Sequence, residues 1–364
     1  MPNPMRYLVV PSKETEAWKE FLISNGWLER GYNIQNENDR RALPLSLSFP
    51  KECPPELSDF EIIERDVPIP NPSNYLGFLE QNLGKNILDE NQQFWPQSFD
   101  QIGELIIVKI EDDVLKFAKD IALALLSQNK KATRVFQDLG VQGDFRIRKL
   151  KLIGGPTDLG GETKIKENGV GFFVDPTKGY YSPRLATERF ETIECALLLK
   201  KKLGRGLNVC DAYAGFGPAL MPLLKNNNLV NFILANDLNP QVIQILKHNL
   251  MKNNKENISL KVKCLDGRKL IEDSENKGFY DLLLVNLPHS TLEHLPLLIG
   301  LLNNNSTSLL RAWCIIDSKE IENVKKQITD MFNSLKYSIS QINVNSARSY
   351  SPTQIYANIE VWLN

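Results

Sequence analysis

Hydrophobic and polar positions follow strand and helix periods along the first part of the chain. The segment MRYLVVP (5–11) has the apolar content of a strand, and TEAWKEFLISNG (15–26) has the spacing of a helix. ALPLSLSFP (42–50) alternates in the manner of an exposed strand. The stretch VPIPNPSN (67–74) contains three prolines, which is typical of a linker. These patterns predict a small α+β domain over residues 1–67.

The middle of the chain mixes the same two periods. SFDQIGELIIVKI (98–110) predicts a turn and a buried strand, and DDVLKFAKDIALALLSQ (112–128) predicts an amphipathic helix with acidic residues at its start. Short alternating segments follow between residues 145 and 184, among them FRIRKLKLI, ETKIKENG and VGFFVD. We therefore expect a second α+β domain over residues 68–190.

Beyond residue 190, strand and helix patterns alternate regularly. FETIECALLLKKKLG is helical, LNVCDAYAGFGP is a strand that ends in a glycine-rich turn, and NFILANDLNP is another strand. PQVIQILKHNLMKNN then predicts a helix, and ISLKVKCLDG and FYDLLLVNLPHS predict two more strands. Such a βαβ series forms a largely parallel, doubly wound sheet. The expected fold class is α/β, with a C-terminal Rossmann-like domain over residues 191–364 preceded by two small α+β domains.

Composition narrows the class of protein. The 364 residues are 42% hydrophobic and 24% charged, as in globular proteins with a substantial core, which excludes wholesale disorder. No apolar run reaches the roughly 18 residues of a membrane span, and the N-terminal residues lack the pattern of a secretory signal. The five cysteines are scattered without CxxC spacing. We therefore expect a cytoplasmic protein with no membrane partner and no metal site.

Charge is unevenly divided along the chain. The whole sequence has a formal net charge of −1, but residues 129–206 hold 16 Lys and Arg against 9 Asp and Glu, a balance of +7. Such a basic segment can bind a polyanion, and it can equally be a solvated charged face. Charge alone does not separate these two interpretations.

Four polar motifs follow successive predicted strands of the C-terminal domain. Because open α/β sheets bind ligands at the carboxyl ends of their strands, we expect the motifs to form one site. The first motif is neither GxGxxG nor a P-loop, which disfavours dinucleotides and nucleoside triphosphates. An acid about twenty residues beyond its glycines can accept both hydroxyls of a ribose. The motifs are Asp211-Ala-Tyr-Ala-Gly-Phe-Gly217, Asn236-Asp-Leu-Asn-Pro240, Asp266-Gly267 and Asn286-Leu-Pro-His-Ser290.

Together these motifs resemble those of class I S-adenosylmethionine-dependent methyltransferases. The resemblance implies S-adenosylmethionine as the cofactor. The residues that it implies for cofactor binding are Asp211, Tyr213, Gly215, Gly217, Asp237, Leu238, Asp266, Gly267 and Asn286. The loop that begins at Asn286 departs from the [ND]PP[YF] loop of amino-group methyltransferases, since His289 stands where those enzymes have an aromatic residue that stacks on the target base.

Motifs upstream narrow the resemblance to one family. The segments GDFRIR (143–148), TKIKENG (163–169) and YSPRLATER (181–189) are similar to those of archaeal and eukaryotic tRNA (guanine-37, N1)-methyltransferases. That family continues with DxFAGxGP, here DAYAGFGP, with an intact NLP, and with a motif matched by RSYSP (348–352). YSPRLATER is the most specific segment, because the related wybutosine aminocarboxypropyl transferases carry a different one there. The resemblance spans nearly the whole chain.

The resemblance implies the chemical roles of two side chains. Guanine N1 loses a proton as it attacks the methyl group, and Glu188 is the candidate base. Negative charge develops on O6, which Arg146 or Arg148 can stabilise; the spacing to Glu188 favours Arg148. Without the resemblance, Glu188 could be an exposed partner of Arg184 or Arg189, and FRIR could be a strand with one wet face.

Further residues of the same segments are candidates for binding the substrate, which the resemblance implies is tRNA. In the family, Asn286 helps to hold an extruded guanine and Pro288 shapes the loop. Tyr180 can stack on that base, although a tyrosine beside a strand end is more often a core residue, and Arg184 is a further candidate. Residues 1–67 correspond to the unit that contacts the tRNA elbow. Candidates for phosphate contacts are Lys130, Lys131, Arg134, Lys149, Lys151, Lys164 and Lys166.

Three other functions remain open. A dual-function archaeal homologue also C-methylates a tricyclic wyosine intermediate at position 37, and DAYAGFGP together with His289 could reflect a wider pocket. Amino-directed methylation of tRNA guanine 26 shares part of the motif set but expects a DPFGSP loop, which is absent. A tRNA-binding protein with a decayed methyltransferase fold conflicts with the intact Asp211, Asp237, Asn286 and Glu188. We expect a monomer with no protein partner.

Overall fold

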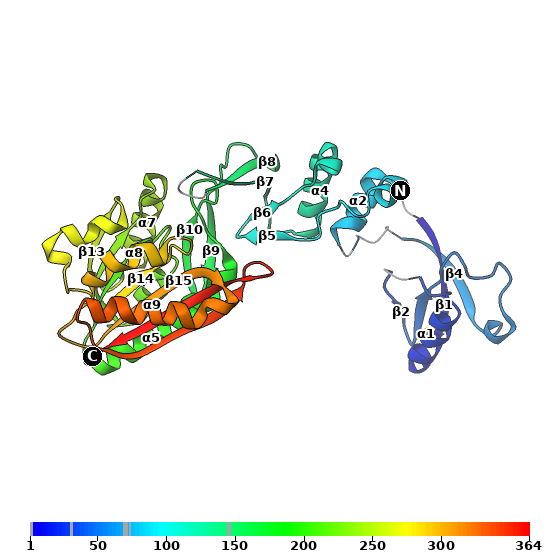
Figure 1. Ribbon diagram of the computed structural model, residues 1–364. Coiled ribbons are helices and arrows are strands. Elements are labelled where there is room, and N and C mark those ends of the chain that lie inside the picture. The colour runs from blue at the N-terminus through cyan, green and yellow to red at the C-terminus, as the bar shows by residue number, and fades with distance from the viewer. Residues whose placement is uncertain (1–2, 30–31, 68–71, 73, 144–146) are drawn as a thin grey trace. The chain divides into compact units, whose positions relative to one another are not determined.

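The computed structural model describes the chain in five stretches, which are residues 3–29, 32–67, 72, 74–143 and 147–364. The chain divides into two compact units. One comprises residues 1–92 with 123–128, and the other comprises residues 93–122 with 129–364. Figure 1 labels their helices and strands. The division into three domains, with boundaries after residues 67 and 190, stays a prediction.

The first unit contains a four-stranded antiparallel sheet and three helices. Its elements are β1 (Asn3–Pro11), α1 (Thr15–Ser24), β2 (Gln35–Glu37), β3 (Arg40–Pro44), β4 (Glu61–Val67), α2 (Tyr75–Leu83) and α3 (Lys85–Glu90). The strand order is β2-β3-β1-β4. Leu22 of α1 joins Leu8 and Leu43 of the sheet in one core, so this helix covers one face. The predicted strand at residues 5–11 and the predicted helix at 15–26 are confirmed.

The prediction of an exposed strand over residues 42–50 is wrong in two respects. Strand β3 ends at Pro44, and Leu43 is fully buried. Burial follows from the position of β3 inside the sheet, where it pairs with β1 on one side and β2 on the other. The chain then turns away, because the Ser46 hydroxyl donates to the Gly26 carbonyl oxygen at 3.0 Å. The alternation of Leu and Ser beyond residue 44 therefore belongs to a turn.

The second unit begins with a small mixed sheet and a separate hairpin. The elements are β5 (Phe99–Ile102), β6 (Leu105–Val108), η3 (Asp112–Phe117), α4 (Ala118–Gln128), β7 (Arg134–Gln142), β8 (Ile147–Gly154), β9 (Thr163–Glu167) and β10 (Val170–Val174). Residues 123–128 of α4 belong to the first unit. The sheet has the order β5-β6-β7-β8, in which only β6 and β7 are parallel. Every residue of β6 is buried, and the helical segment follows it, as the sequence predicts.

The rest of the second unit is a seven-stranded sheet in the order β13-β12-β11-β14-β15-β17-β16. Its strands are β11 (Leu207–Asp211), β12 (Val230–Asn236), β13 (Ser259–Lys263), β14 (Leu282–Val285), β15 (Ser308–Asp317), β16 (Ile339–Ser349) and β17 (Gln354–Leu363). Strands β13, β12, β11, β14 and β15 run parallel to one another, which confirms the predicted Rossmann-like fold class. Strands β17 and β16 add an antiparallel pair at one edge, which the sequence analysis did not predict.

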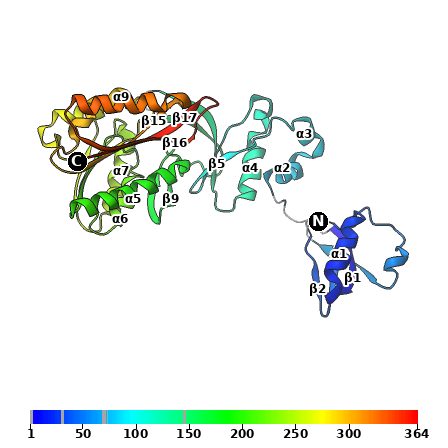
Figure 2. The same cartoon turned by 60° about the horizontal axis from the view of Figure 1, so that its bottom comes forward.

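Helices cover both faces of this sheet. They are α5 (Ala186–Leu203), α6 (Leu220–Lys225), α7 (Pro240–Asn253), α8 (Thr291–Leu298) and α9 (Ile321–Ser334). Figure 2 shows α5 and α9 on opposite faces. Successive residues of β11 alternate accordingly, since Val209 belongs to the core with α5 and Cys210 belongs to the core with α9. In the described ranges, no helix is long and apolar enough to cross a membrane.

Candidate active site

A cavity opens at the carboxyl ends of the central strands. It brings together four residues that the sequence predicts for the site, namely Glu188, Asp211, Tyr213 and Asn286. The other lining residues are Leu185, Arg189, Ala214, Pro218, Ala219, Leu284, Trp313 and Tyr356. The cavity thus joins the turn after β11, the end of β14 and the first turn of α5. Among the described residues, no cluster of three or more His, Cys, Asp or Glu could hold a metal ion.

The turn after β11 is built on two glycines with left-handed backbone conformations. Gly215 has a φ of +54° and Gly217 a φ of +80°, which side chains rarely adopt. A Cβ atom on Gly217 would also lie 2.8 Å from Leu246 Cδ1. The Gly215 amide donates to Asp237 Oδ2 at 2.8 Å, so the acid after β12 holds the turn. Leu238, the next predicted cofactor residue, is 48% exposed.

Asp211 supplies a buried carboxylate at the cavity wall. Its Oδ1 accepts a hydrogen bond from the Tyr213 amide at 3.2 Å. Burial raises the pKa of Asp211 to about 7, and the nearby Asp237 adds to this rise. Burial also raises the pKa of Asp237, against the effect of its bonds from backbone amides. Both acids therefore sit where a cationic ligand would favour their charged forms.

Two buried asparagines, neither of them among the predicted site residues, hold the strand ends in place. The Asn236 amide donates to the carbonyl oxygens of Ala212 (3.0 Å) and Leu265 (2.9 Å), and so links the ends of β11, β12 and β13. Asn249 of α7 exchanges hydrogen bonds with the backbone of Phe173, which connects β10 to the same region. A buried polar group needs such partners. For Asn249, the signal in the sequence was an asparagine at an apolar helical position.

On the other side of the turn, Tyr213 covers Gly267. A Cβ atom on Gly267 would lie 2.7 Å from Tyr213 Cζ, so the glycine allows this close approach. The Tyr213 hydroxyl and His294 Nδ1 are 2.6 Å apart. Asp266 forms an ion pair with Arg268 at 2.6 Å, which lowers the pKa of Asp266 to about 2. Roles of Asp266 and Gly267 in adenine binding stay predictions.

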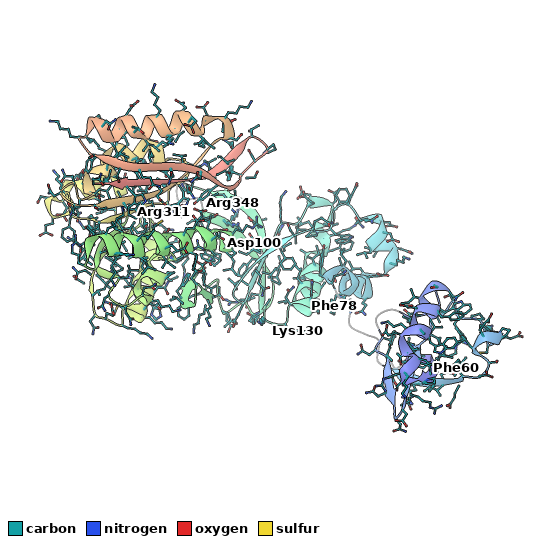
Figure 3. All side chains as sticks on the ribbon, turned by 90° about the horizontal axis from the view of Figure 1, so that it is seen from below. Phe60, Phe78, Asp100, Lys130, Arg311 and Arg348 are labelled. Carbon is teal, nitrogen blue, oxygen red and sulfur yellow. The ribbon has the colours of Figure 1, made fainter. Side chains whose placement is uncertain are left out.

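The carboxylate of Glu188 lies at the cavity wall, close to three side chains from strands β15 and β17. Pro183 begins the short turn η4 (Pro183–Leu185), which places Glu188 in the first turn of α5 with only 8% exposure. Its Oε2 accepts from Trp313 Nε1 at 2.8 Å and from Asn358 Nδ2 at 3.2 Å. Arg311 Nη2 lies 3.8 Å from the same oxygen. Figure 3 labels Arg311 between the sheet and α5.

The interpretation of Glu188 as an exposed partner of Arg184 or Arg189 is wrong. Arg189 instead forms a buried pair with Glu167, at 2.5 Å from Nε to Oε1. Arg184 pairs with Asp100 at 2.7 Å, and Arg148 pairs with the other oxygen of Asp100 at 3.0 Å. Asp100, on β5, is labelled in Figure 3 and was not identified from the sequence. Arg146 lies outside the described residues.

The loop after β14 meets the C-terminal hairpin. The Tyr356 hydroxyl donates to Asn286 Oδ1 at 3.0 Å. The ring of His289 packs edge-on against Tyr350, with centroids 5.8 Å apart. The NLP loop and the RSYSP motif, which are far apart in the sequence, therefore lie side by side. Pro288, between them, accepts a hydrogen bond at its carbonyl oxygen from a β15 amide.

The predicted phosphate contacts divide into exposed lysines and one buried arginine. Arg134 is 3% exposed, and its guanidinium donates to the carbonyl oxygens of Leu159, Gly160 and Glu162. It therefore holds a loop, and the prediction that it contacts phosphate is wrong. Tyr180 is 48% exposed, as a stacking residue requires. The exposed lysines are Lys130, Lys131, Lys149, Lys151, Lys164 and Lys166.

Two family descriptions match most of the second unit. Residues 79–158 match the TYW2 N-terminal domain, and residues 163–339 match the TRM5/TYW2 methyltransferase domain. The boundary between the two matches falls in the loop before β9. The residues that line the cavity belong to the second match, except Tyr356, which lies in the C-terminal hairpin beyond it.

Relatives and solved structures extend the match over the chain. The tRNA (guanine(37)-N(1))-methyltransferase Trm5b of Pyrococcus abyssi is 32% identical over 291 residues, which are 78% of each chain. Its crystal structure has a TM-score of 0.70 at 26% identity and covers 99% of each chain. A complex of aTrm5 with tRNALeu has a TM-score of 0.70 at 23% identity over 98% of this chain and 99% of that one. TYW2 of P. horikoshii with MeSAdo has a TM-score of 0.63 at 17% identity over 78% and 97%. The chain therefore belongs to the TRM5/TYW2 methyltransferase family.

Proposed function

We propose that this protein transfers a methyl group from S-adenosylmethionine to N1 of guanine 37 in tRNA. The observation that carries the proposal is the single cavity shared by Asp211, Asn286 and the buried carboxylate of Glu188. We call the part of the site around Asp211 its cofactor side and the part around Glu188 its base side. The activity named for the P. abyssi relative supports the same target.

The residues around the turn after β11 fit S-adenosylmethionine. A Cβ atom on Gly215 would meet no atom closer than the Tyr180 carbonyl oxygen at 4.0 Å, so the backbone there is open to a ligand. Asp211 and Asp237 supply two carboxylates, and the ligand carries a positive sulfonium and a positive ammonium group. When bound, it supplies an electrophilic methyl group. Asp211, Asp237 and the glycine turn would hold it.

Glu188 acts as the general base in this proposal. Guanine N1 carries a proton that must leave as the nitrogen attacks carbon, and a positioned carboxylate can accept it. Glu188 is buried and lines the cavity, and among the described residues only one of its two oxygens receives hydrogen bonds. Removal of the proton places negative charge on O6 of the base.

Arg148 stabilises that charge. A guanidinium that is held in place before the reaction gives more stabilisation than one that must reorganise. Asp100 holds Arg148 at 3.0 Å and Arg184 at 2.7 Å, while Asp138 lies 3.8 Å from Arg148. Arg184 lies in η4, which leads directly into α5. Through its two ion pairs, Asp100 therefore links Arg148 to the helix that carries Glu188.

The remaining candidates bind the tRNA. Asn286 and Pro288 contact the extruded guanine, and the exposed ring of Tyr180 stacks on it, which is worth about 1–3 kcal/mol per base. Exposed lysines then contact the phosphates without specifying sequence. Those that we assign to this role are Lys130, Lys131 and Lys149, together with Lys151, Lys164 and Lys166.

A second candidate is a dual function in which a tricyclic wyosine intermediate at position 37 also receives a methyl group on carbon. The observation in its favour is the pair of His289 and Tyr350, because Tyr350 keeps 45% exposure beside the NLP loop. An exposed ring at this place offers stacking surface to a base larger than guanine.

Radiolabelled methyl transfer to unmodified tRNA transcripts tests the proposal. Transcripts that differ only in G37 or A37 are methylated and digested to nucleosides. We expect label in 1-methylguanosine from the G37 transcript and none from the A37 transcript. Label in another nucleoside contradicts the target. No transfer to either transcript, with S-adenosylmethionine still bound, contradicts both candidates and indicates a wyosine intermediate as the acceptor in place of guanine 37.

A further inference from the structure

Two neighbouring strands present a ladder of polar side chains toward α5. Strands β15 and β17 are antiparallel, and their register places Arg311 opposite Glu360 and Trp313 opposite Asn358. Residues two apart on a strand share one face of the sheet, so these two pairs lie on the same face. Arg311 is 2% exposed and pairs with Glu360 at 2.8 Å. This face therefore carries a prebuilt polar wall.

The wall contacts only one oxygen of the Glu188 carboxylate. Trp313 Nε1 and Asn358 Nδ2 both donate to Oε2, at 2.8 and 3.2 Å. Arg311 lies on the same side, 3.8 Å from Oε2. Within the part of the chain that the structure describes, Oε1 accepts no hydrogen bond, and it is not among the fully enclosed polar atoms without a partner. Oε1 of Glu188 is thus open to the cavity that this residue lines.

We infer that Trp313 and Asn358 are positioning residues, which occupy Oε2 of Glu188 and so make Oε1 the atom that accepts the proton from the base. The inference rests on the proposed function. An indole N–H can only donate, and an amide N–H turned toward the carboxylate does the same. A proton on Oε2 would collide with both donors, which leaves Oε1 as the acceptor.

The reaction balances with the groups already named. The proton on guanine N1 moves to Oε1 of Glu188, and the electron pair of that N–H bond remains on the base. N1 forms a bond to the methyl carbon, and the pair of the broken carbon–sulfur bond stays on sulfur. The products are 1-methylguanine in the tRNA, S-adenosylhomocysteine and a protonated Glu188, which returns its proton to water. No further reactant is needed.

Rigid placement is the contribution of the two positioning residues. A carboxylate on α5 could otherwise rotate about its last torsion and exchange its two oxygens. Transfer of a proton depends on a separation set to within a fraction of an ångström. Donors fixed on paired strands restrain the rotation more firmly than a surface side chain or water would. Arg311 supports them, since its closest partner is Glu360 rather than Glu188.

The test uses single-turnover methyl transfer to the G37 transcript by Trp313→Phe and Asn358→Leu. Loss of a hydrogen bond to a charged group lowers the rate by about 10- to 100-fold. The dissociation constants for S-adenosylmethionine and tRNA stay unchanged. Trp18→Phe is the matched control, because Trp18 Nε1 donates to another carboxylate, Glu14 Oε2, at 3.0 Å, and neither residue belongs to the polar wall. We expect the control to keep the wild-type rate.

A double-variant cycle separates positioning from a general structural role. If Trp313 acts through Glu188, Trp313→Phe has no further effect on the rate in a Glu188→Gln background. An equal loss in both backgrounds overturns the inference, as does a wild-type rate for both Trp313→Phe and Asn358→Leu while Glu188→Gln is slow. A wild-type rate for Glu188→Gln overturns the proposed base itself, and the inference with it.

Discussion

The cofactor side and the base side of the cavity are built in different ways. On the cofactor side, Asp211 binds the amide of Tyr213, two residues away, and Asp237 binds that of Gly215, 22 residues away. On the base side, Glu188 and its two hydrogen-bond partners are 125 and 170 residues apart in the sequence. The first arrangement is encoded in a short βαβ segment. The second exists only after β17 has paired with β15.

The two sides also differ in how they stabilise a carboxylate. Asp211 is buried, and no Lys or Arg in the described ranges forms an ion pair with it, so its pKa rises to about 7. Glu188 is equally buried but has donors from Trp313 and Asn358 and the charge of Arg311 nearby. Asp211 therefore lacks a positive partner, which a cationic ligand could supply. The partners of Glu188, in contrast, are side chains of the protein itself.

The largest effect should follow removal of the carboxylate on the base side. Glu188→Gln keeps the size and the burial of the side chain but cannot accept a proton, so single-turnover transfer should slow by about 10²- to 10⁴-fold. Affinity for S-adenosylmethionine, measured by isothermal titration, should not change. A loss of cofactor affinity would show that the two sides are not separable.

The matching change on the cofactor side should weaken cofactor binding and leave the transfer rate nearly unchanged. Asp237→Ala removes the acceptor for the Gly215 amide and for a ribose, and the lost charge-assisted bonds should weaken S-adenosylmethionine binding by about 100-fold. At saturating cofactor, the transfer rate should remain within a few fold of wild type. If the affinity is normal and the rate falls, Asp237 does not belong to the cofactor side.

Loss of the arginine that we propose to stabilise O6 should have a smaller effect than loss of the proposed base. Arg148→Ala should slow single-turnover transfer by about 100-fold, in line with the removal of one charge-stabilising donor. Asp100→Asn should cost about tenfold, because it only loosens Arg148 and Arg184. Equal rates for Asp100→Asn and wild type would remove the role of Asp100 as a support.

Affinity for S-adenosylmethionine should depend on pH through Asp211. Its pKa is raised to about 7, so the carboxyl group becomes neutral as the pH falls below that value. A neutral acid attracts a cationic ligand less, and the dissociation constant should rise by up to about tenfold between pH 8 and pH 6. Asp211→Asn should bind weakly at both pH values, without the pH dependence. A wild-type constant that is flat over this range contradicts the assignment.

The smallest effects are expected at the lysines. Lys149→Ala and Lys151→Ala should each lower the slope of log K for tRNA against log salt by about 1. Lys326→Ala, an exposed lysine on α9, is the matched control and should leave the slope unchanged. The transfer rate at saturating tRNA should not change in any of the three variants. Equal slopes for all of them would remove these lysines from the tRNA path.

The sequence predicted the placement of the residues around the turn after β11 well, because the information for it is local. Strand periodicity, two glycines and acids at strand ends are enough to place Asp211, Gly215 and Asp237 at one edge of the sheet. Resemblance to a family added Glu188 and Asn286, and both line the cavity. The monomeric state and the cytoplasmic location stay predictions.

Long-range contacts explain what the sequence did not show. Trp313, Asn358 and Arg311 look like ordinary residues of apolar strands, and only the pairing of β15 with β17 brings them to Glu188. Arg134 looked like other basic residues of its segment, but it is buried and its guanidinium donates to three carbonyl oxygens of the loop at residues 159–162. Asp100 lies in an acidic stretch of the sequence. Its partners, Arg148 and Arg184, are 48 and 84 residues away. Local patterns contain no information on such partners.

Methyl transfer to a tRNA transcript with inosine at position 37 tests the central claim most directly. Inosine retains N1–H and O6 of guanine but lacks the exocyclic amino group. If N1 is the acceptor and Glu188 removes its proton, the protein should form 1-methylinosine at a rate close to that for 1-methylguanosine. Formation of N2-methylguanosine in the guanine transcript, with no transfer to the inosine transcript, would contradict the account, because the amino group would then be the acceptor.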